Sequence, residues 1–256
     1  MRLKVQKHIQ DVLSRDGAML FVLIDPVDHP SKEKAAQAAL HACEGGADII
    51  LVGGSIGAQG AILDETTKLI KERVNVPVVL FPGNIATLTP YADAVYFMSL
   101  LNSRNPYWIS QAQTLAAPIV KQLGIETLPV GYIVVEPGGT VGWVGDANLV
   151  PRDKPAIAAS LALAGELMGS HYIITDVGSA SKMGPVPLEM VSAVSKWITV
   201  PYIVAGGVRT EKQAKDIIAA GADIIQVGTA IEKESDVKGI VSLLSEAIKE
   251  KGRKKA

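Results

Sequence analysis

The sequence predicts an α/β fold in which parallel strands alternate with helices. Short apolar runs such as VVLF and YIVV recur along the chain with little polar alternation, which is typical of strands buried on both faces. Stretches with the period of an amphipathic helix separate these runs, and this alternation indicates a parallel sheet. Because eight strands fall within 256 residues, the pattern favours a closed, TIM-like (β/α)8 barrel over an open sheet.

The predicted elements follow one another in a regular order. The strands are predicted at Met19–Asp25, Asp48–Gly53, Pro77–Phe81, Ala94–Ser99, Leu128–Glu136, Tyr172–Asp176, Pro201–Ala205 and Asp223–Gly228. The helices are predicted at Lys4–Ser14, Ser31–Cys43, Ala61–Arg73, Pro106–Gln122, Pro155–Met168, Pro187–Trp197, Thr210–Ala219 and Glu234–Lys251. Several of these helices have Ser, Thr or Asp near the start and Gly just past the end, which are helix-cap signals.

The connection after the third strand departs from this order. Between Phe81 and Asp93 it holds Pro82, Gly83 and Pro90, which break helices, so we expect an irregular segment in place of the helix there. No linker rich in Ser, Pro or charge divides the chain, and residues 1–256 are predicted to form a single barrel domain.

Composition excludes several classes of protein. Apolar residues make up 48% of the chain and charged residues 20%, so it does not resemble a disordered protein. The 25 basic and 26 acidic residues nearly balance, which gives no footprint for nucleic acid. One cysteine, Cys43, excludes an intrachain disulfide. Without a run of 18 apolar residues or a start of signal-peptide type, we expect no transmembrane segment and a cytoplasmic location.

Glycine-rich turns follow three neighbouring predicted strands. Gly178 comes after the sixth strand, Gly206-Gly207 after the seventh and Gly228 at the end of the eighth. Glycine lets backbone N–H groups approach an anion closely, and these loops of a barrel often bind phosphate. The alternative is that the glycines only form tight turns. Three adjacent glycine-rich ends favour a small molecule that carries phosphate.

Oxygen-bearing side chains stand at further strand ends. Asp25 ends the first strand and Ser55 follows the second, and such hard oxygen ligands suit Mg²⁺. Asp25 could instead act as a base or cap the next helix. Glu136 ends the fifth predicted strand and is a candidate base, hydroxyl-binding group or partner in a structural ion pair.

The segment Val76–Leu101 is unusually apolar. Asp93 is its only charged residue, and it holds Phe81, Tyr91 and Phe97. Part of the segment forms strand core. The rest is either ordinary core packing or the lining of a groove for a long hydrophobic ligand.

The ordered strand ends resemble one known family. LIDPVDHP, LVGGS, VVEPGGTVGWVGDA, TDVGSAS, VAGGVRT and VGTAIE are similar, in this order, to geranylgeranylglyceryl phosphate synthases of archaea and some bacterial relatives. The resemblance spans the chain from about Asp25 to about Lys233. Single motifs such as GGS are common in phosphate-binding barrels, whereas the full set is specific.

This resemblance implies a Mg²⁺-dependent prenyltransferase. Such an enzyme joins geranylgeranyl diphosphate to the C3 hydroxyl of sn-glycerol 1-phosphate, which forms the first ether bond of archaeal lipids. It implies magnesium at Asp25 and Ser55, a proton acceptor or hydroxyl-binding group at Asp176 or Glu136, and a homodimer or hexamer. Glycerol 1-phosphate is implied at Ile174, Thr175, Asp176, Val177, Gly178, Ser179, Ala180, Gly206, Gly207, Gly228 and Thr229.

The motif after the sixth strand departs from the family. Many relatives read YLEAGSG there, whereas this chain has Ile174 for Tyr, Asp176 for Glu and Ala180 for the last Gly. Asp176 keeps the charge on a shorter side chain. The Tyr contact is lost unless Tyr172 or another residue replaces it.

Two other functions fit the same barrel. One is a metal-independent phosphosugar isomerase or lyase with Asp25 and Glu136 as its acid/base pair, which needs no apolar groove. The other is a barrel that binds a phosphate ligand without catalysis.

Overall fold

A computed structural model describes residues 3–179, 181–228 and 236–254. Each strand pairs in parallel with the next along the chain, and β8 pairs with β1, so the described strands close into one barrel. The predicted (β/α)8 fold is confirmed. The strands are β1 Met19–Ile24, β2 Ile49–Gly54, β3 Val78–Pro82, β4 Ala94–Leu100, β5 Glu126–Val134, β6 Tyr172–Asp176, β7 Tyr202–Ala205 and β8 Ile224–Val227.

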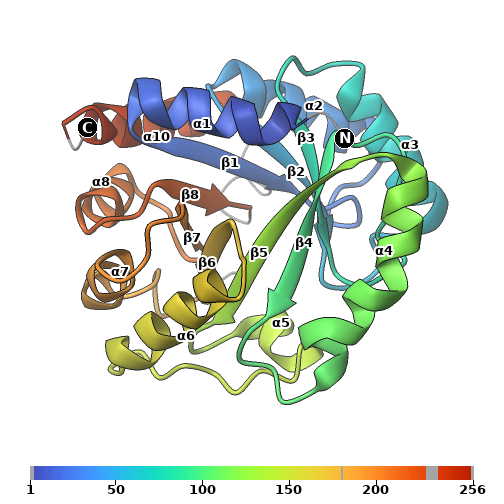
Figure 1. The fold of residues 1–256 in the computed structure, drawn as a ribbon. Coiled ribbons are helices and arrows are strands. Elements are labelled where there is room, and N and C mark those ends of the chain that lie inside the picture. The colour runs from blue at the N-terminus through green and yellow to red at the C-terminus, as the bar shows by residue number, and fades with distance from the viewer. Residues whose placement is uncertain (1–2, 180, 229–235, 255–256) are drawn as a thin grey trace.

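Helices surround the barrel, as Figure 1 shows. The described helices are α1 Lys4–Asp16, α2 Lys32–Glu44, α3 Gly60–Lys71, α4 Ala112–Leu123, α5 Gly139–Val144, α6 Pro155–Leu167, α7 Leu188–Ser195, α8 Glu211–Ala219 and α10 Val237–Gly252, and a π-helical turn η1, Tyr107–Gln111, precedes α4. Residues 83–93 are all described and contain no helix, so the expected irregular segment after β3 is confirmed. Within the described chain, no helix has the length and apolar character needed to cross a bilayer.

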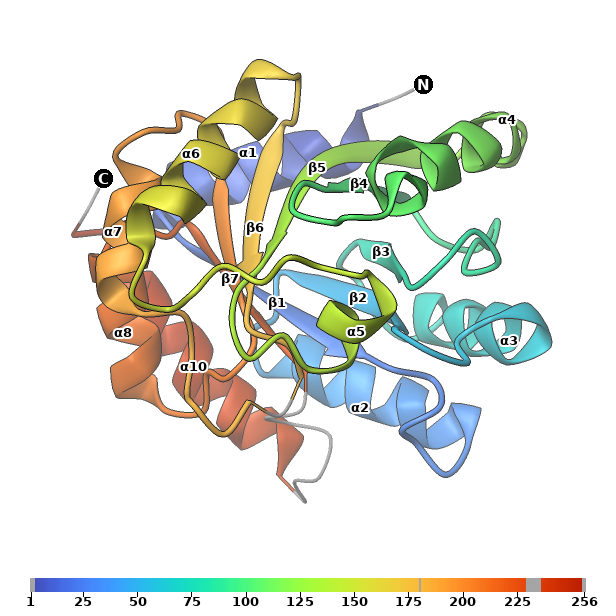
Figure 2. The same cartoon turned by 90° about the horizontal axis from the view of Figure 1, so that it is seen from below.

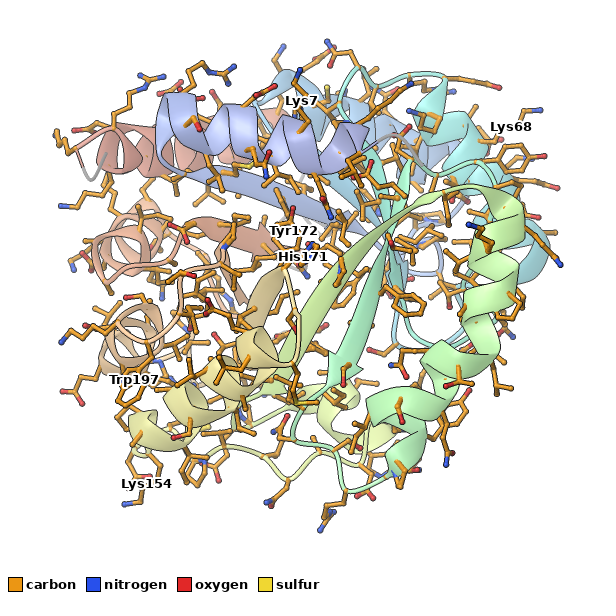
Figure 3. The ribbon with its side chains drawn as sticks, in the orientation of Figure 1. Lys7, Lys68, Lys154, His171, Tyr172 and Trp197 are labelled. Atoms are coloured by element: carbon orange, nitrogen blue, oxygen red, sulfur yellow. The ribbon has the colours of Figure 1, made fainter. Side chains whose placement is uncertain are left out.

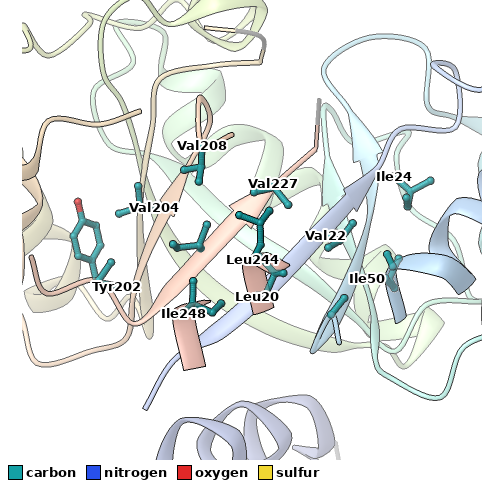
Figure 4. Packing of buried hydrophobic residues seen from close by; sticks show 14 of the residues in the cluster. Leu20, Val22, Ile24, Ile50, Tyr202, Val204, Val208, Val227, Leu244 and Ile248 are labelled. Carbon is teal, nitrogen blue, oxygen red and sulfur yellow. The ribbon is translucent and has the colours of Figure 1, made fainter. Parts of the chain in front are cut away.

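Two apolar layers hold the barrel together. Residues that point outward from the strands pack under the helices, and Figure 4 shows Leu20 of β1 beside Leu244 and Ile248 of α10. The alternate residues, such as Phe21, fill the interior of the barrel. Successive side chains on a strand point to opposite faces, so both faces must be apolar, as the continuous apolar runs predicted.

The helix α1 closes the amino-terminal end of the barrel. Its residues Val5, Ile9 and Val12 are buried against the interior layer. The buried Glu126 carboxylate accepts hydrogen bonds of 2.8 Å from the backbone N–H groups of Val5 and Gln6, where the helix dipole favours negative charge. Figures 1 and 2 place α5 at the opposite end. Because α1 covers the amino-terminal end of the barrel, a binding site can form only at the carboxyl ends of the strands, where α5 lies.

Candidate active site

A cleft of about 410 Å³ opens at the carboxyl ends of the strands and continues beside β4 and α4. This volume lies in the range of small-molecule sites. One part, the polar end, is lined by Asp25, Asp28, Ser55, Asp176, Ser179, Gly206, Gly207, Arg209 and Gly228. The other part, the apolar groove, is lined by Leu88, Val95, Phe97, Met98, Trp108, Ala112, Ala116 and Val120.

Asp25 is a carboxylate that has no cationic partner among the described residues. It follows β1, and the N–H of Val27 donates to its Oδ1 at 3.1 Å. No Lys or Arg in the described chain forms an ion pair with it. Burial raises the pKa of Asp25 to about 6, and the nearby charge of Asp28 adds to this effect. A side chain at Gly54 would overlap the Asp25 carboxylate, so the carboxylate keeps this position because Gly54 has no Cβ.

The polar end has the oxygen donors that a magnesium ion needs. Ser55 and Asp28 line the same cleft as Asp25. The described residues contain no cluster of three or more His, Cys, Asp or Glu side chains. Mg²⁺ is usually bound by one or two carboxylates together with water and substrate phosphates, so it does not require such a cluster. The donor set fits an ion shared with a phosphate-bearing ligand.

Asp176 is held by two hydrogen bonds at the end of β6. The Gly178 N–H donates to Oδ1 at 2.6 Å, and the Tyr132 hydroxyl donates to Oδ2 at 2.7 Å. Burial raises the pKa of Asp176 in spite of these two donors. Burial and the Asp176 charge also raise the pKa of Tyr132, which keeps its phenol protonated as a donor. Asp176 therefore caps the turn and also faces the cleft.

Tyr132 places a phenol beside Asp176 in the cleft. It lies on β5 directly beside Ile174 of β6, and Ile174 is fully buried inside the barrel. Tyr172 lies at the start of β6 beneath α1, as Figure 3 shows, and is not among the described residues that line the cleft. Tyr132 is a residue of the cleft that was not predicted from the sequence. Its signal was the strand period, which places Tyr132 and Val134 on the inward face of β5.

The side chains of the predicted glycerol phosphate segment divide between the cleft and the packed wall of the barrel. The side chains of Ile174, Thr175 and Val177 are fully buried and do not line the cleft. Ile174 points into the barrel, whereas Thr175 and Val177 point outward; the Thr175 hydroxyl lies 2.7 Å from that of Tyr202. Alternate strand residues face opposite sides, so consecutive residues cannot all reach one ligand. Ala180 and Thr229 lie outside the described residues.

The glycine turns form the other wall of the polar end. Gly206 and Gly207 have φ values of 80° and 72°, which favour glycine. A Cβ at Gly207 would lie 2.5 Å from the Gly184 carbonyl oxygen, so this turn rests on the loop between β6 and α7. Arg209 is the one Lys or Arg among the described lining residues, and its Nη2 donates to the Ser181 carbonyl at 3.3 Å. Backbone N–H groups and one cation suit an anion.

Glu136 does not belong to this cleft. The strand β5 ends at Val134, and Val135 then bridges to Val150, so the chain turns before Glu136. Its Oε2 accepts from the backbone N–H of Arg152 at 3.4 Å, and Glu136 is not among the described lining residues. The prediction of Glu136 as a base assumed that the strand continued to this residue. The structure places it in a structural contact with Arg152 instead.

The apolar groove follows from the missing helix after β3. Outward-facing Val95 and Phe97 of β4 line the groove, whereas elsewhere such residues are covered by a helix. Ala112, Ala116 and Val120 recur every four residues on α4 and therefore form its other wall. The Val76–Leu101 segment was expected to form either ordinary core or the lining of a groove. Its residues Val95 and Phe97 line the groove.

Comparisons with known proteins agree with this geometry. The model of the PcrB family matches residues 14–246. The chain is 50% identical to a geranylgeranylglyceryl phosphate synthase of Methanosarcina acetivorans, over 96% of this chain and 100% of that protein. It is 51% identical to the synthase of Thermococcus kodakarensis, over 92% of each chain.

Solved structures give the same result. The crystal structure of (S)-3-O-geranylgeranylglyceryl phosphate synthase from Thermoplasma acidophilum, in complex with substrate sn-glycerol-1-phosphate, matches with a TM-score of 0.92 and 37% identity, covering 98% of this chain and 100% of that one. A thiamine phosphate pyrophosphorylase from Pyrococcus furiosus matches with a TM-score of 0.61 and 16% identity, covering 93% and 98%, which shows the fold alone. The family resemblance predicted from the strand ends is confirmed: the chain belongs to the PcrB family, together with the geranylgeranylglyceryl phosphate synthases.

Proposed function

We propose that this chain transfers a prenyl group from geranylgeranyl diphosphate to the C3 hydroxyl of sn-glycerol 1-phosphate. One observation carries the proposal: a polar end suited to phosphates continues into a groove suited to a long apolar chain. The names of its relatives and the glycerol phosphate complex of the Thermoplasma acidophilum enzyme support it. In the reaction the hydroxyl oxygen bonds to C1 of the prenyl chain, the bond from C1 to the diphosphate breaks, and the hydroxyl proton leaves.

Asp25, Asp28 and Ser55 would hold magnesium beside the diphosphate. When bound there, Mg²⁺ neutralises the charge that develops on the leaving diphosphate. The Asp25 carboxylate suits this position because it has no cationic partner within the described chain.

The glycine turns would hold the acceptor. Ser179, Gly206-Gly207, Gly228 and Arg209 line one wall of the cleft, and their backbone N–H groups and the Arg209 charge would bind the phosphate. Asp176 faces the same space and holds a glycerol hydroxyl or accepts its proton. Fixing both reactants at short range supplies much of the rate enhancement in such a reaction.

The groove would hold the prenyl chain and keep water from the allylic carbon. Its side chains are apolar along β4 and α4, so burial of each CH₂ group contributes about 0.8 kcal/mol to binding. Excluding water matters because the allylic carbon carries positive charge in the transition state and would otherwise react with solvent.

The rival isomerase or lyase fits less well. It needs Asp25 and Glu136 on one substrate, whereas Glu136 contacts Arg152 outside the described lining of the cleft. It also gives the apolar groove no role.

Simultaneous binding of both substrates tests the proposal. We would titrate the protein with sn-glycerol 1-phosphate in the presence and absence of an unreactive thiodiphosphate analogue of geranylgeranyl diphosphate and Mg²⁺. The proposal predicts that each ligand binds while the other is present. Mutual exclusion of the two ligands, as expected for one shared phosphosugar site, would contradict it.

A further inference from the structure

Arg152 joins two of the loops that surround the polar end. Its Nη1 donates to the carbonyl oxygen of Glu136 at 3.2 Å. Its Nη2 donates to the carbonyl oxygens of Met183 at 3.1 Å and Pro185 at 2.7 Å. One half-buried guanidinium therefore binds three main-chain carbonyls, one from the loop after β5 and two from the loop after β6.

Each of these loops supports a glycine turn of the polar end. A Cβ at Gly178 would lie 2.5 Å from the Gly138 carbonyl oxygen, and the Gly138 N–H donates to Val177 at 3.2 Å. In the same way Gly207 rests on Gly184. Gly184 lies between Met183 and Pro185, whose carbonyls Arg152 binds. The contacts form one continuous chain from Arg152 to both turns.

We propose that Arg152 is a positioning residue that fixes the spacing between the turns at Gly178 and Gly207, and so sets the affinity for the phosphate of the acceptor. The ligand in this proposal rests on the proposed function. Arg152 is not among the described residues that line the cleft, so it acts through the two loops. A planar guanidinium presents several donors in a fixed fork, whereas a lysine ammonium is a point charge that cannot span the same carbonyls.

The test compares Arg152→Gln and Arg152→Lys with Arg104→Gln. Arg104 pairs with Asp146 at the surface, so its loss removes the same charge without touching the carbonyls of Glu136, Met183 and Pro185 that Arg152 binds. Hydrogen exchange of each protein without ligand reports on the loops themselves, and KM is measured for both substrates. We expect faster exchange at residues 178–179, 181–184 and 206–208 in Arg152→Gln. We also expect a KM for sn-glycerol 1-phosphate raised about tenfold, with the KM for the prenyl diphosphate within about twofold of wild type.

The control and the conservative variant decide the interpretation. Arg104→Gln should leave exchange and both KM values unchanged, and Arg152→Lys should lie between Arg152→Gln and wild type. Unchanged exchange in these loops, or an equal loss for both substrates, would overturn the proposal. Should Arg152→Gln not fold, Arg152→Lys carries the same comparison. Because exchange is measured without ligand, it decides the role of Arg152 even if the wild-type protein fails to use glycerol 1-phosphate.

Discussion

The Tyr132 hydroxyl donates a 2.7 Å hydrogen bond to Asp176 from the neighbouring strand. Tyr132 lies beside Ile174, the position at which many relatives carry a tyrosine. The phenol therefore reaches the carboxylate from β5 instead of β6. The Asp176 carboxylate is thus held by a phenol where both side chains line the cleft.

Loss of the Asp176 carboxylate should weaken use of the acceptor. A charge-assisted hydrogen bond contributes roughly 1.5–3 kcal/mol, so Asp176→Ala should raise the KM for sn-glycerol 1-phosphate about ten- to a hundredfold. Asp176→Glu should be tolerated. Thr175→Val is the matched control, because Thr175 bonds to Tyr202 away from the cleft. Thr175→Val should lower the melting temperature and leave the KM for sn-glycerol 1-phosphate unchanged. If Asp176→Ala behaves in the same way, Asp176 is only a turn cap.

Asp25→Asn should abolish turnover and stabilise the fold above pH 6. Burial raises the pKa of Asp25 to about 6, above its unfolded value near 3.9. Between these values the folded state holds the proton that the unfolded state has lost, so the stability of the wild-type protein falls as pH rises through this window. After discounting for solvent screening, Asp25→Asn should raise the free energy of unfolding by about 1–2 kcal/mol above pH 6, which corresponds to a melting temperature roughly 2–6 °C higher.

Thermal melts of wild type and Asp25→Asn at pH 4 and pH 8 check this sign. The two melting temperatures should agree at pH 4, and the variant should melt higher at pH 8. A wild-type advantage at pH 8 would show that the carboxylate is stabilised in the fold. Near-normal activity of Asp25→Asn with Mg²⁺ would refute the metal role.

Restoring the family tyrosine at position 174 should not help this chain. Ile174 is fully buried beside Tyr132, so Ile174→Tyr overpacks the barrel and costs about 1–3 kcal/mol. Tyr132→Phe keeps the ring but removes the hydrogen bond to Asp176. It should weaken acceptor binding while changing the melting temperature less than Ile174→Tyr does. Calorimetric titration and thermal melts of both variants separate the two effects.

The groove should set which prenyl chains fit. Ala116 lines the groove, so Ala116→Phe fills it partway along and should shift preference toward shorter prenyl diphosphates. Leu115→Phe adds bulk to the adjacent, exposed position and serves as control. Products from prenyl diphosphates of several lengths are compared for each variant. Equal preferences in Ala116→Phe and wild type would place the prenyl chain elsewhere.

Much of the fold could be predicted because its strands are buried on both faces. Strands of this kind are apolar at every position, so each one shows in the sequence as a continuous apolar run. The helix α5 was not predicted because it is short and contains Gly139 and Gly142, and glycine has a low helix propensity. Asp25 could be predicted because an unpaired carboxylate directly after an apolar strand is costly to bury and therefore points to a ligand or a metal. Glu136 shared that signal, yet it lies in the turn after β5 and contacts Arg152, and such a tertiary contact leaves no local pattern.

The homodimer or hexamer implied by the family resemblance stays a prediction. Light scattering of the purified chain gives the mass of the assembly directly. A mass of two or six chains is expected, and a monomer at micromolar concentration would contradict the expectation.

Product formation tests the central claim most directly. The wild-type protein is incubated with radiolabelled sn-glycerol 1-phosphate, geranylgeranyl diphosphate and Mg²⁺, with Asp25→Asn and the sn-glycerol 3-phosphate enantiomer as controls. We predict a labelled product that partitions into organic solvent, has the mass of the geranylgeranyl ether, and is lost in both controls. Absence of this ether with every prenyl diphosphate tried, by a protein that binds glycerol 1-phosphate, would contradict the account.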